Sequence, residues 1–221
     1  MTEGLDLAVD PREIVADGYD TIAERYYEWS DARPSAVRLR WLARALEHIP
    51  PGADVLDLGC GAGVPITRAL AAGRQVTGID ISARQIELAR AAVPEATFVQ
   101  ADMTALDIAP ASLDAVVAFY SLTHVPRAHL PELLAAVRRW LRPGGILIAS
   151  MGAQDSPDVV EPDWLGVPMF FSHHGAKKNR ALVRRVGLEL EEAVVEVEPE
   201  DRHDALFLWV LARRPLEALD G

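Results

Sequence analysis

Apolar residues recur every three or four positions over the first fifty residues of the chain, until a Pro-Pro-Gly run at residues 50–52 interrupts them. Such spacing brings apolar side chains onto one face of a helix, and proline followed by glycine ends a helix. The pattern therefore predicts two leading helices, over residues 11–29 and 34–49.

From residue 53 onward, short apolar runs alternate with helical patterns. The runs favour buried strands, and strands that alternate with helices are typical of a parallel sheet covered by helices on both faces. The expected strands are 53–58, 75–80, 96–100, 114–120 and 145–151, and the expected helices are 63–72, 82–92, 129–141 and 176–186.

Residues that start or stop helices support these boundaries. Pro65 falls in the first turn of its expected helix and Gly73 just past the end, where each residue is favoured. Ser82 and Gln85 have the spacing of a capping box, and Pro94 ends the helix that they begin.

The pattern changes after residue 186. Two strand-like runs, 188–198 and 205–213, follow one another with only the polar turn from Pro199 to Asp204 between them. We therefore expect an antiparallel pair at the end of the sheet.

The segment from Gly152 to Gly175 has no regular pattern. It contains three prolines and a mixture of aromatic and histidine side chains. A loop of this length inside a compact domain usually forms a lid or a binding element. We expect this segment, together with the helices of residues 1–50, to cover the binding edge of the sheet.

Composition narrows the class of protein. A chain of 221 residues, half of them hydrophobic, is long enough for one substantial core, and we expect a single domain over residues 1–221. The formal net charge of −11 and the lack of a basic stripe argue against a nucleic-acid partner. The single cysteine, Cys60, excludes an internal disulfide and a multi-thiolate metal site, and we expect it to be a packing residue.

The first ten residues lack the basic start and apolar core of a secretory signal, and the longest apolar runs are far shorter than the ~20 residues that span a bilayer. We therefore expect a soluble cytoplasmic protein with no membrane partner. The sequence leaves open whether it is a monomer or a homodimer.

The stretch DVLDLGCGAG places Gly59, Gly61 and Gly63 directly after an apolar run and before an expected helix. Without a Cβ at these positions, a ligand can lie against the turn, and the amides that lead into the helix can face polar or negative groups. A merely tight turn is the alternative, but Asp57 followed by three alternate glycines between a strand and a helix favours a ligand site.

Asp80 ends the next expected strand, in the stretch VTGID. A carboxylate at this point of a doubly wound sheet accepts hydrogen bonds from the two hydroxyls of a ribose, which indicates an adenosine-containing ligand. Asp102 and Met103 follow the third strand, where they could accept from an adenine amino group and cover its ring. Taken alone, these two residues are more typical of a turn.

These motifs, in their order and approximate spacing, resemble those of class I S-adenosylmethionine-dependent methyltransferases. The resemblance rests on VLDLGCGAG, VTGIDIS, VQADM, LDAVVAFYSLTHV and WLRPGGILIAS, which together cover about residues 53–151. It implies an α/β fold with a Rossmann-like, doubly wound sheet of seven strands, mostly parallel with a C-terminal antiparallel hairpin. It also implies S-adenosylmethionine as cofactor and S-adenosylhomocysteine as product.

The resemblance also implies how the cofactor is held. The glycines would pack on its methionine and ribose, Asp80 and Ile81 would hold the ribose, Asp102 and Met103 would flank adenine, and Phe119 and Tyr120 would border the sulfonium. The leading YDTIAERYYEW resembles an N-terminal helix that closes over the cofactor and brings a tyrosine to the methyl donor. The residues expected at the cofactor are Tyr19, Tyr26, Asp57, Gly59, Gly61, Gly63, Asp80, Ile81, Gln85, Asp102, Met103, Phe119 and Tyr120.

His124, in YSLTHVP just beyond the fourth strand, is the expected general base. Ligands of open α/β sheets bind at the carboxyl ends of the strands, and an imidazole titrates near neutral pH. The alternative is that His124 only hydrogen-bonds a loop or lines the pocket. His173 and His174 lie in the expected lid, and one of them could face the substrate; His173 is the second catalytic candidate. A metal site made of these histidines and Asp155 has no supporting ligand motif, and we expect no metal.

The acceptor site is less defined than the cofactor site. Tyr27, the neighbour of Tyr26, could turn toward the substrate, and the aromatic side chains of the lid either line an apolar acceptor pocket or anchor the loop on the sheet. The residues expected at the substrate are Tyr27, His124, Trp164, Phe170 and His173.

The sequence therefore predicts a methyltransferase that acts on an oxygen, nitrogen or sulfur atom of a small, partly apolar metabolite, most like the enzymes of secondary metabolism and quinone-type biosynthesis. A nicotinamide-dependent oxidoreductase is the chief alternative, but its usual fingerprint is GxGxxG, whereas this chain has GxGxG followed by Val64 and Pro65. A non-catalytic protein that binds an adenosine ligand is a second alternative.

Overall fold

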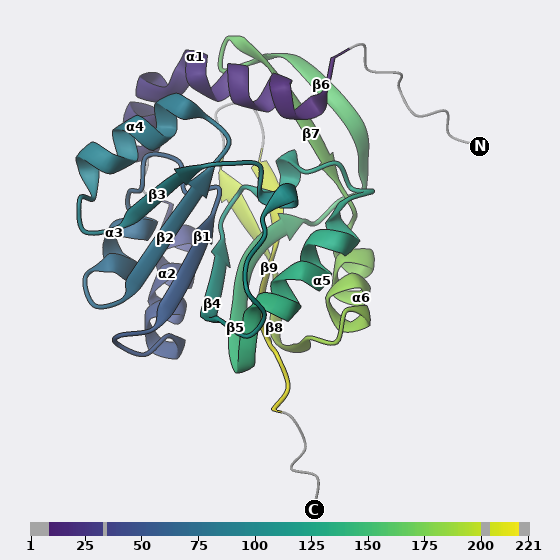
Figure 1. The fold of residues 1–221 in the computed structure, drawn as a ribbon. Coiled ribbons are helices and arrows are strands. Elements are labelled where there is room, and N and C mark those ends of the chain that lie inside the picture. Colours follow the sequence, from purple (N-terminus) through teal and green to yellow (C-terminus); the bar gives the residue numbers. More distant parts are fainter. Residues whose placement is uncertain (1–8, 33–34, 200–203, 217–221) are drawn as a thin grey trace, which may run out of the picture.

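A seven-stranded sheet forms the centre of the protein in a computed structural model, which describes residues 9–32, 35–199 and 204–216 (Figure 1). Its strand order is β3-β2-β1-β4-β5-β9-β8. The strands are β1 (Asp54–Leu58), β2 (Gln75–Asp80), β3 (Thr97–Gln100), β4 (Leu113–Ala118), β5 (Leu141–Gly152), β8 (Glu189–Pro199) and β9 (Asp204–Arg213).

Strands β1 to β5 run parallel, whereas β9 pairs antiparallel with both β5 and β8. The expected doubly wound sheet with a C-terminal antiparallel hairpin is confirmed. The order reverses at β1, which has β2 on one side and β4 on the other, and a reversal of this kind leaves a crevice at the carboxyl ends of the strands. Most of the turn expected between β8 and β9, residues 200–203, lies outside the described residues.

Helices cover both faces of the sheet because alternate strand residues point to opposite sides. Leu56 and Val116 face α5 and α6, while Val55 and Val117 face α2 and α3. The helices are α1 (Pro11–Ala32), α2 (Ala36–His48), α3 (Ile66–Ala71), α4 (Ala83–Ala92), α5 (Leu130–Trp140) and α6 (Ala176–Arg185).

Two of the expected helix boundaries need correction. Pro65 occupies the N-cap of α3 rather than its first turn, while Gly73 does follow the C-cap residue, Ala72. At α4, the Ser82 hydroxyl oxygen accepts from the Gln85 backbone N–H at 3.0 Å, as a capping box requires. The reciprocal bond from the Gln85 side chain is absent, because that side chain points into a cavity.

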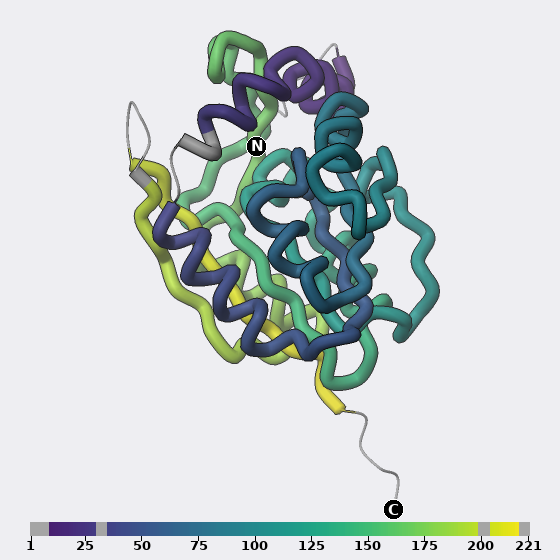
Figure 2. The backbone as a smooth tube through the Cα atoms, turned by 90° about the vertical axis from the view of Figure 1, so that its left-hand side faces the viewer, coloured from purple at the N-terminus to yellow at the C-terminus, as the bar shows by residue number. Residues whose placement is uncertain are grey.

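The carboxyl ends of the parallel strands are covered by α1 and by a two-stranded sheet, β6 (Ser156–Trp164) paired with β7 (Val167–His173). Figures 1 and 2 show α1 lying across this edge beside the β6–β7 ribbon. We call α1, β6 and β7 the lid. The prediction of an irregular loop over residues 152–175 was wrong, since most of the segment pairs with itself and packs on α1 through Met169 and Phe170.

The expected role of α2 in the lid was also wrong. Trp41 on α2 stacks on Trp209 of β9, with ring centroids 5.4 Å apart, so α2 belongs to the layer on one face of the sheet. Among the described helices, not one combines the length and the apolar character that crossing a membrane requires.

Candidate functional site

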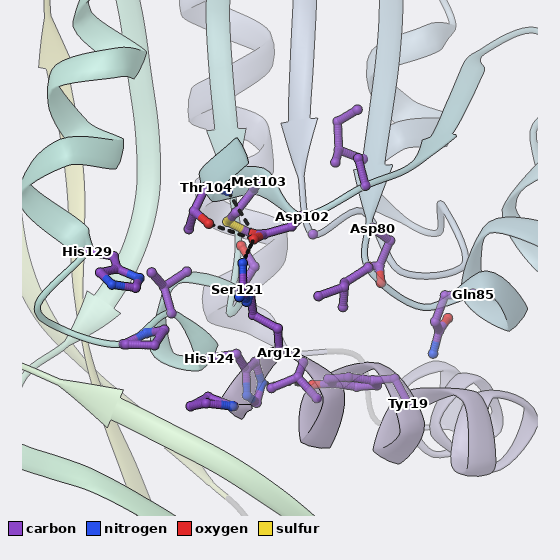
Figure 3. A pocket seen from close by; sticks show the side chains of 18 of the residues that line it. Arg12, Tyr19, Asp80, Gln85, Asp102, Met103, Thr104, Ser121, His124 and His129 are labelled. Carbon is purple, nitrogen blue, oxygen red and sulfur yellow. Dashed lines mark hydrogen bonds and ion pairs between the residues drawn. The ribbon is translucent and has the colours of Figure 1, made fainter. Parts of the chain in front are cut away.

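A cavity of about 500 Å³ lies between the lid and the carboxyl ends of the parallel strands. This volume is in the range of sites for small ligands. Figure 3 shows side chains entering it from α1 and from the segments that follow β2, β3 and β4. Part of its lining is the turn after β1 together with Asp80 at the end of β2, which we call the floor.

The three glycines of the floor have left-handed φ values between 54° and 77°, but they face different neighbours. A Cβ at Gly61 would meet only the Gln85 side chain, at 3.7 Å, so the backbone there is open to a ligand. A Cβ at Gly59 would lie 2.2 Å from the Cβ of Ser121, and one at Gly63 would press on Val93 and Phe98. Gly59 lines the cavity, whereas Gly63, which was also expected at the cofactor, does not line it and instead lies against Val93 and Phe98.

Asp80 is fixed by backbone donors. One carboxylate oxygen accepts from the Gly61 N–H at 2.9 Å and the other from the Ser82 N–H at 3.0 Å. Burial raises the pKa of Asp80, and these two amides act in the opposite direction. The carboxylate oxygens keep lone pairs that can accept hydrogen bonds from a ligand in the cavity.

The Gln85 amide is a buried polar group whose nitrogen and oxygen have no hydrogen-bond partner among the described residues. The residue is 1% exposed and lines the cavity opposite Gly61. A buried amide without partners costs free energy unless a ligand or water satisfies it. Gln85, Gly61 and Asp80 together therefore fit a polar ligand such as the ribose end of an adenosine.

A second, smaller cavity of about 70 Å³ lies on the other side of the glycine turn. It contains Asp57, which accepts from the Thr67 hydroxyl at 2.6 Å and whose pKa burial raises to about 7. Arg38 and Tyr27 also line it, so Tyr27 faces this cavity rather than the larger one in which the substrate was expected. Gly61, Gln85 and the aromatic residues Tyr26, Phe119 and Tyr120 are common to both cavities.

The segment after β3 forms another wall. Asp102 caps a short 3₁₀ turn by accepting from the Thr104 N–H at 2.8 Å, and Met103 lies beside it in the lining. The Arg12 guanidinium reaches from α1 to within 3.4 Å of the Asp102 carboxylate (Figure 3). Arg12 also bonds Asp10 and lowers the pKa of that carboxyl to about 2. The ion pair between Arg12 and Asp102 therefore links the lid to the segment after β3.

His124 is held by hydrogen bonds at both ring nitrogens. Nδ1 lies 2.8 Å from the Phe170 carbonyl oxygen of β7, and Nε2 lies 3.0 Å from the Tyr19 hydroxyl of α1. Burial lowers the pKa of His124 to about 4, so the ring is neutral at neutral pH. Both Tyr19 and His124 line the cavity, and Figure 3 shows their side chains pointing toward one another.

Tyr120 follows β4 with a φ of 61°, in the left-handed region that a non-glycine residue seldom adopts. Its N–H donates to the Ser150 hydroxyl oxygen, and its own hydroxyl donates to the Glu198 carboxylate at 2.5 Å. Burial, followed by Glu198, raises the pKa of this phenol. Strained backbone of this kind is common at functional sites, and here it directs Tyr120 between the two cavities.

Three residues expected at the substrate line neither cavity. The Phe170 ring is fully buried between α1 and β7, and only its carbonyl bonds His124. Trp164 packs against the rings of Tyr19 and Tyr26, with centroids 5.7 and 5.9 Å away, so its ring joins β6 to α1 within the lid. His173 lies against Gly152 and bonds the Gln154 carbonyl at 2.7 Å.

His174, which directly follows β7, does not line the cavity either. It is buried with its Nδ1 3.6 Å from Asp155. The described part of the chain contains no group of three potential ligands that could hold a metal ion. Cys60 is half-buried, burial raises the pKa of its thiol, and Gly78 leaves the space that its sulfur occupies.

Sequence reasoning missed several lining residues: Asp10, Arg12, Ser121, His129 and Asp158. Ser121 could have been predicted from the sequence, because it directly follows Tyr120, which was expected at the cofactor. The acid–proline–arginine start of α1 was a visible helix signal, but nothing local shows that Arg12 reaches Asp102. Asp158 enters the lining only because β6 folds back over the sheet.

A family model described as a methyltransferase domain matches residues 55–145 of the chain. The match begins in β1 and ends in β5, so it contains the whole floor of the cavity. The lid lies outside the matched range.

Among curated proteins, the chain is similar to the ubiquinone biosynthesis O-methyltransferase of Paracidovorax citrulli. The two are 31% identical over 150 residues, which cover 62% of this chain and 60% of the relative. The chain spans about half to three fifths of the length of the curated relatives it matches.

Two solved structures share the fold. A SAM-dependent methyltransferase from Methanosarcina mazei superposes with a TM-score of 0.67 at 24% identity, over 77% of this chain and 96% of that one. The 1,6-didemethyltoxoflavin-N1-methyltransferase of Burkholderia thailandensis, solved with 1,6-didemethyltoxoflavin and S-adenosylhomocysteine bound, superposes with a TM-score of 0.65 at 20% identity, over 96% of this chain and 94% of that one.

Proposed function

We propose that this chain, which belongs to the class I S-adenosylmethionine-dependent methyltransferases, moves a methyl group from S-adenosylmethionine to an oxygen, nitrogen or sulfur atom of a small, partly apolar molecule. The observation that carries the proposal is the floor of the cavity. There an open glycine backbone at Gly61 faces both the carboxylate of Asp80 and the unpartnered amide of Gln85.

The cofactor's adenosine would lie in the larger cavity. Asp80 would accept from the ribose hydroxyls, with Ile81 beside it, and Gln85 would satisfy its amide on the ligand. Met103 would cover the adenine ring, and Asp102 would accept from its amino group while it keeps its bond to Thr104.

The cofactor's amino-acid end would lie in the smaller cavity. That end carries a carboxylate and an ammonium, and the cavity contains both a guanidinium, on Arg38, and a carboxyl, on Asp57. Tyr26 and Phe119, which line both cavities, would then border the sulfonium between the two ends. When bound, the cofactor supplies an activated methyl group for an in-line displacement, so the protein chiefly has to align the acceptor and exclude water.

The acceptor would enter where the larger cavity is bounded by Tyr19, His124 and the segment from Val125 to His129. Val125, Pro126 and Ala128 give this part of the lining an apolar side, and Tyr19, His124, His129 and Asp158 add polar groups, which favours a small, partly apolar molecule. Quinone methyltransferases are among the relatives, and a toxoflavin methyltransferase is among the structural neighbours. We therefore place the acceptor among quinone-like or secondary metabolites.

A binding experiment tests the floor. Calorimetric titration of the whole protein with S-adenosylhomocysteine should show binding, and Asp80→Asn should weaken it by roughly 30-fold, because two charge-assisted hydrogen bonds are lost. Asp17→Asn, which changes an exposed carboxylate on α1, is the matched control. Wild-type affinity in Asp80→Asn, or binding of NADH in place of S-adenosylhomocysteine, would contradict the proposal.

A transfer experiment tests the reaction. Incubation with S-adenosylmethionine labelled in its methyl group and with extracts of the source organism should label at least one small molecule. Binding without any labelled product would instead favour a protein that only binds the adenosine ligand.

A further inference from the structure

The tautomer of His124 follows from its partners. The Phe170 carbonyl oxygen can only accept a hydrogen bond, so the nitrogen that contacts it, Nδ1, must carry a hydrogen. In a neutral ring Nε2 then has no hydrogen and can only accept. The Tyr19 hydroxyl, 3.0 Å away, is therefore the donor in that bond.

The direction of this bond decides what Tyr19 offers to the cavity. Because its hydrogen points to His124, the Tyr19 oxygen can act only as an acceptor toward a hydroxyl that enters the cavity beside it. The three groups come from different parts of the fold: Tyr19 from α1, His124 from the 3₁₀ turn after β4, and Phe170 from β7. The arrangement therefore exists only while the lid covers the sheet.

We propose that Tyr19 and His124 form a proton relay for an acceptor that carries a hydroxyl group. The acceptor's hydrogen passes to the Tyr19 oxygen while the hydrogen of Tyr19 passes to Nε2 of His124. This inference rests on the proposed function, because it assumes that the acceptor is methylated in this cavity by a sulfonium donor.

The protons and charges balance along this path. The acceptor's O–H bond breaks and a new Tyr19 O–H bond forms; the former Tyr19 O–H bond breaks and an Nε2–H bond forms. The donor's positive charge ends on the imidazolium of His124, whose Nδ1–H remains bonded to the Phe170 carbonyl. Opening of the lid then lets water take this proton.

The low basicity of His124 limits which acceptors can pass a proton to the relay. A base with a pKa of about 4 cannot ionise a phenol, whose pKa is near 10, before the transfer. A hydroxyl oxygen becomes strongly acidic as it gains a methyl group, so it can release its hydrogen to such a base as the bond forms. A methylated amine holds its proton near pH 10 and would not pass it on. The relay therefore fits a hydroxyl acceptor.

The surroundings of His124 contain few charges that could change this picture. Both ring nitrogens contact uncharged groups, and desolvation is the main cause of the lowered pKa. The other ionisable residues that line the same cavity are Asp10 and Arg12 at the start of α1, Tyr26 on α1, Asp158 on β6, His129 before α5, Tyr120 after β4, and Asp80 and Asp102 at the strand ends.

Nitrogen NMR of the histidine-labelled protein tests the geometry without an acceptor. We expect His124 with a hydrogen on Nδ1 and none on Nε2 from pH 8 down to about pH 5, with S-adenosylhomocysteine bound. Tyr19→Phe should shift the Nε2 signal, whereas Thr21→Val, which removes an exposed hydroxyl from the same helix, should leave it unchanged. A hydrogen on Nε2, or an unchanged Nε2 signal in Tyr19→Phe, would overturn the relay.

Turnover tests the proton path with the acceptor identified by methyl labelling. Tyr19→Phe and His124→Gln should each lower kcat by roughly 100-fold, and the double variant should be no slower than either one, because the two residues act as a unit. The relay would be overturned if the double variant lost kcat by the product of the two single losses, or if the product were methylated on nitrogen or sulfur. Binding of S-adenosylhomocysteine separates failure of the relay from failure of the proposed function. If only the relay fails, the unmodified protein and both variants still bind it; if the proposed function fails, the unmodified protein does not bind it.

Discussion

The floor and the lid of the cavity are held in place by different kinds of interaction. The floor is shaped by backbone: Gly59 and Gly61 adopt left-handed φ values, and amide N–H groups fix Asp80. The lid is held by side chains, among them the bond between Tyr19 and His124 and the contacts of Asp20 with the start of α4. The floor is therefore part of the folded sheet, whereas the lid can be loosened by changes that leave the sheet intact.

The substitution with the largest expected effect on stability lies in the floor. Gly59→Ala places a Cβ 2.2 Å from the Ser121 Cβ and forces a left-handed φ on alanine, so the free energy of unfolding should fall by roughly 3 to 5 kcal/mol. Denaturant unfolding measures this change. Gly73→Ala, where a Cβ would meet nothing within 4 Å, is the control. Similar stability of the two variants would mean that the floor can relax.

The next effect concerns His124, which joins the lid to the 3₁₀ turn after β4. The pKa of His124 is about 4 in the folded protein and 6.5 in the reference state, so its contribution to stability is present above pH 6.5 and is lost as the pH falls toward 4. Between pH 7 and pH 4 the wild type should lose about 3 kcal/mol more than His124→Gln.

Asp57 acts in the opposite direction over part of this range, since burial raises its pKa to about 7 and its contribution falls as the pH rises. It is present in both proteins, so the difference between their pH profiles isolates His124. Parallel profiles in denaturant unfolding would show that His124 is not buried as a neutral ring.

A smaller effect loosens the lid alone. Asp20 on α1 accepts from the Ser82 hydroxyl and from the Arg84 N–H, and so caps α4 from outside that helix. Asp20→Ala should lower the free energy of unfolding by about 1 kcal/mol, as loss of a helix cap does. Asp17→Ala, on the same helix, should change it by only a few tenths of that amount. Equal effects of the two changes would remove Asp20 from the lid's attachment.

The smallest expected effect is that of the charged link. Arg12 is an exposed side chain 3.4 Å from Asp102, and such ion pairs contribute little to stability and weaken in salt. Arg12→Ala should therefore reduce stability slightly at low salt and leave it unchanged near 1 M salt. A large loss that persists in salt would show that Arg12 also packs against the lid.

The sequence predicted the sheet and its helices closely, because β1 and β4 are short, mainly apolar segments set between helical patterns. The β6–β7 pair was missed because its segment contains three prolines and no alternation. The pairing of β6 with β7 depends on α1, because apolar residues of α1 pack on β7. That contact joins distant parts of the chain, so no local sequence pattern predicts it.

The candidate site shows the same division. Asp80, Gly61 and Asp102 were predicted because strand ends and glycine turns are local features, and the structure brings all three to one cavity. Gly63 lies outside the cavity lining, and the sequence did not predict this, because a glycine that makes room for a ligand and one that makes room for a neighbouring helix look alike in a sequence. Arg12 was missed because its partner lies 90 residues away.

The contact of Asp20 with α4 has a consequence for ligand affinity. That helix begins three residues after Asp80. Binding of a ligand to Asp80 and closure of α1 over α4 therefore depend on neighbouring backbone amides, those of Ser82 and Arg84. If occupancy favours closure, closure favours occupancy by the same factor, since linkage between two equilibria is reciprocal. A substitution on the outer helix would then change the dissociation constant of a ligand that it never touches.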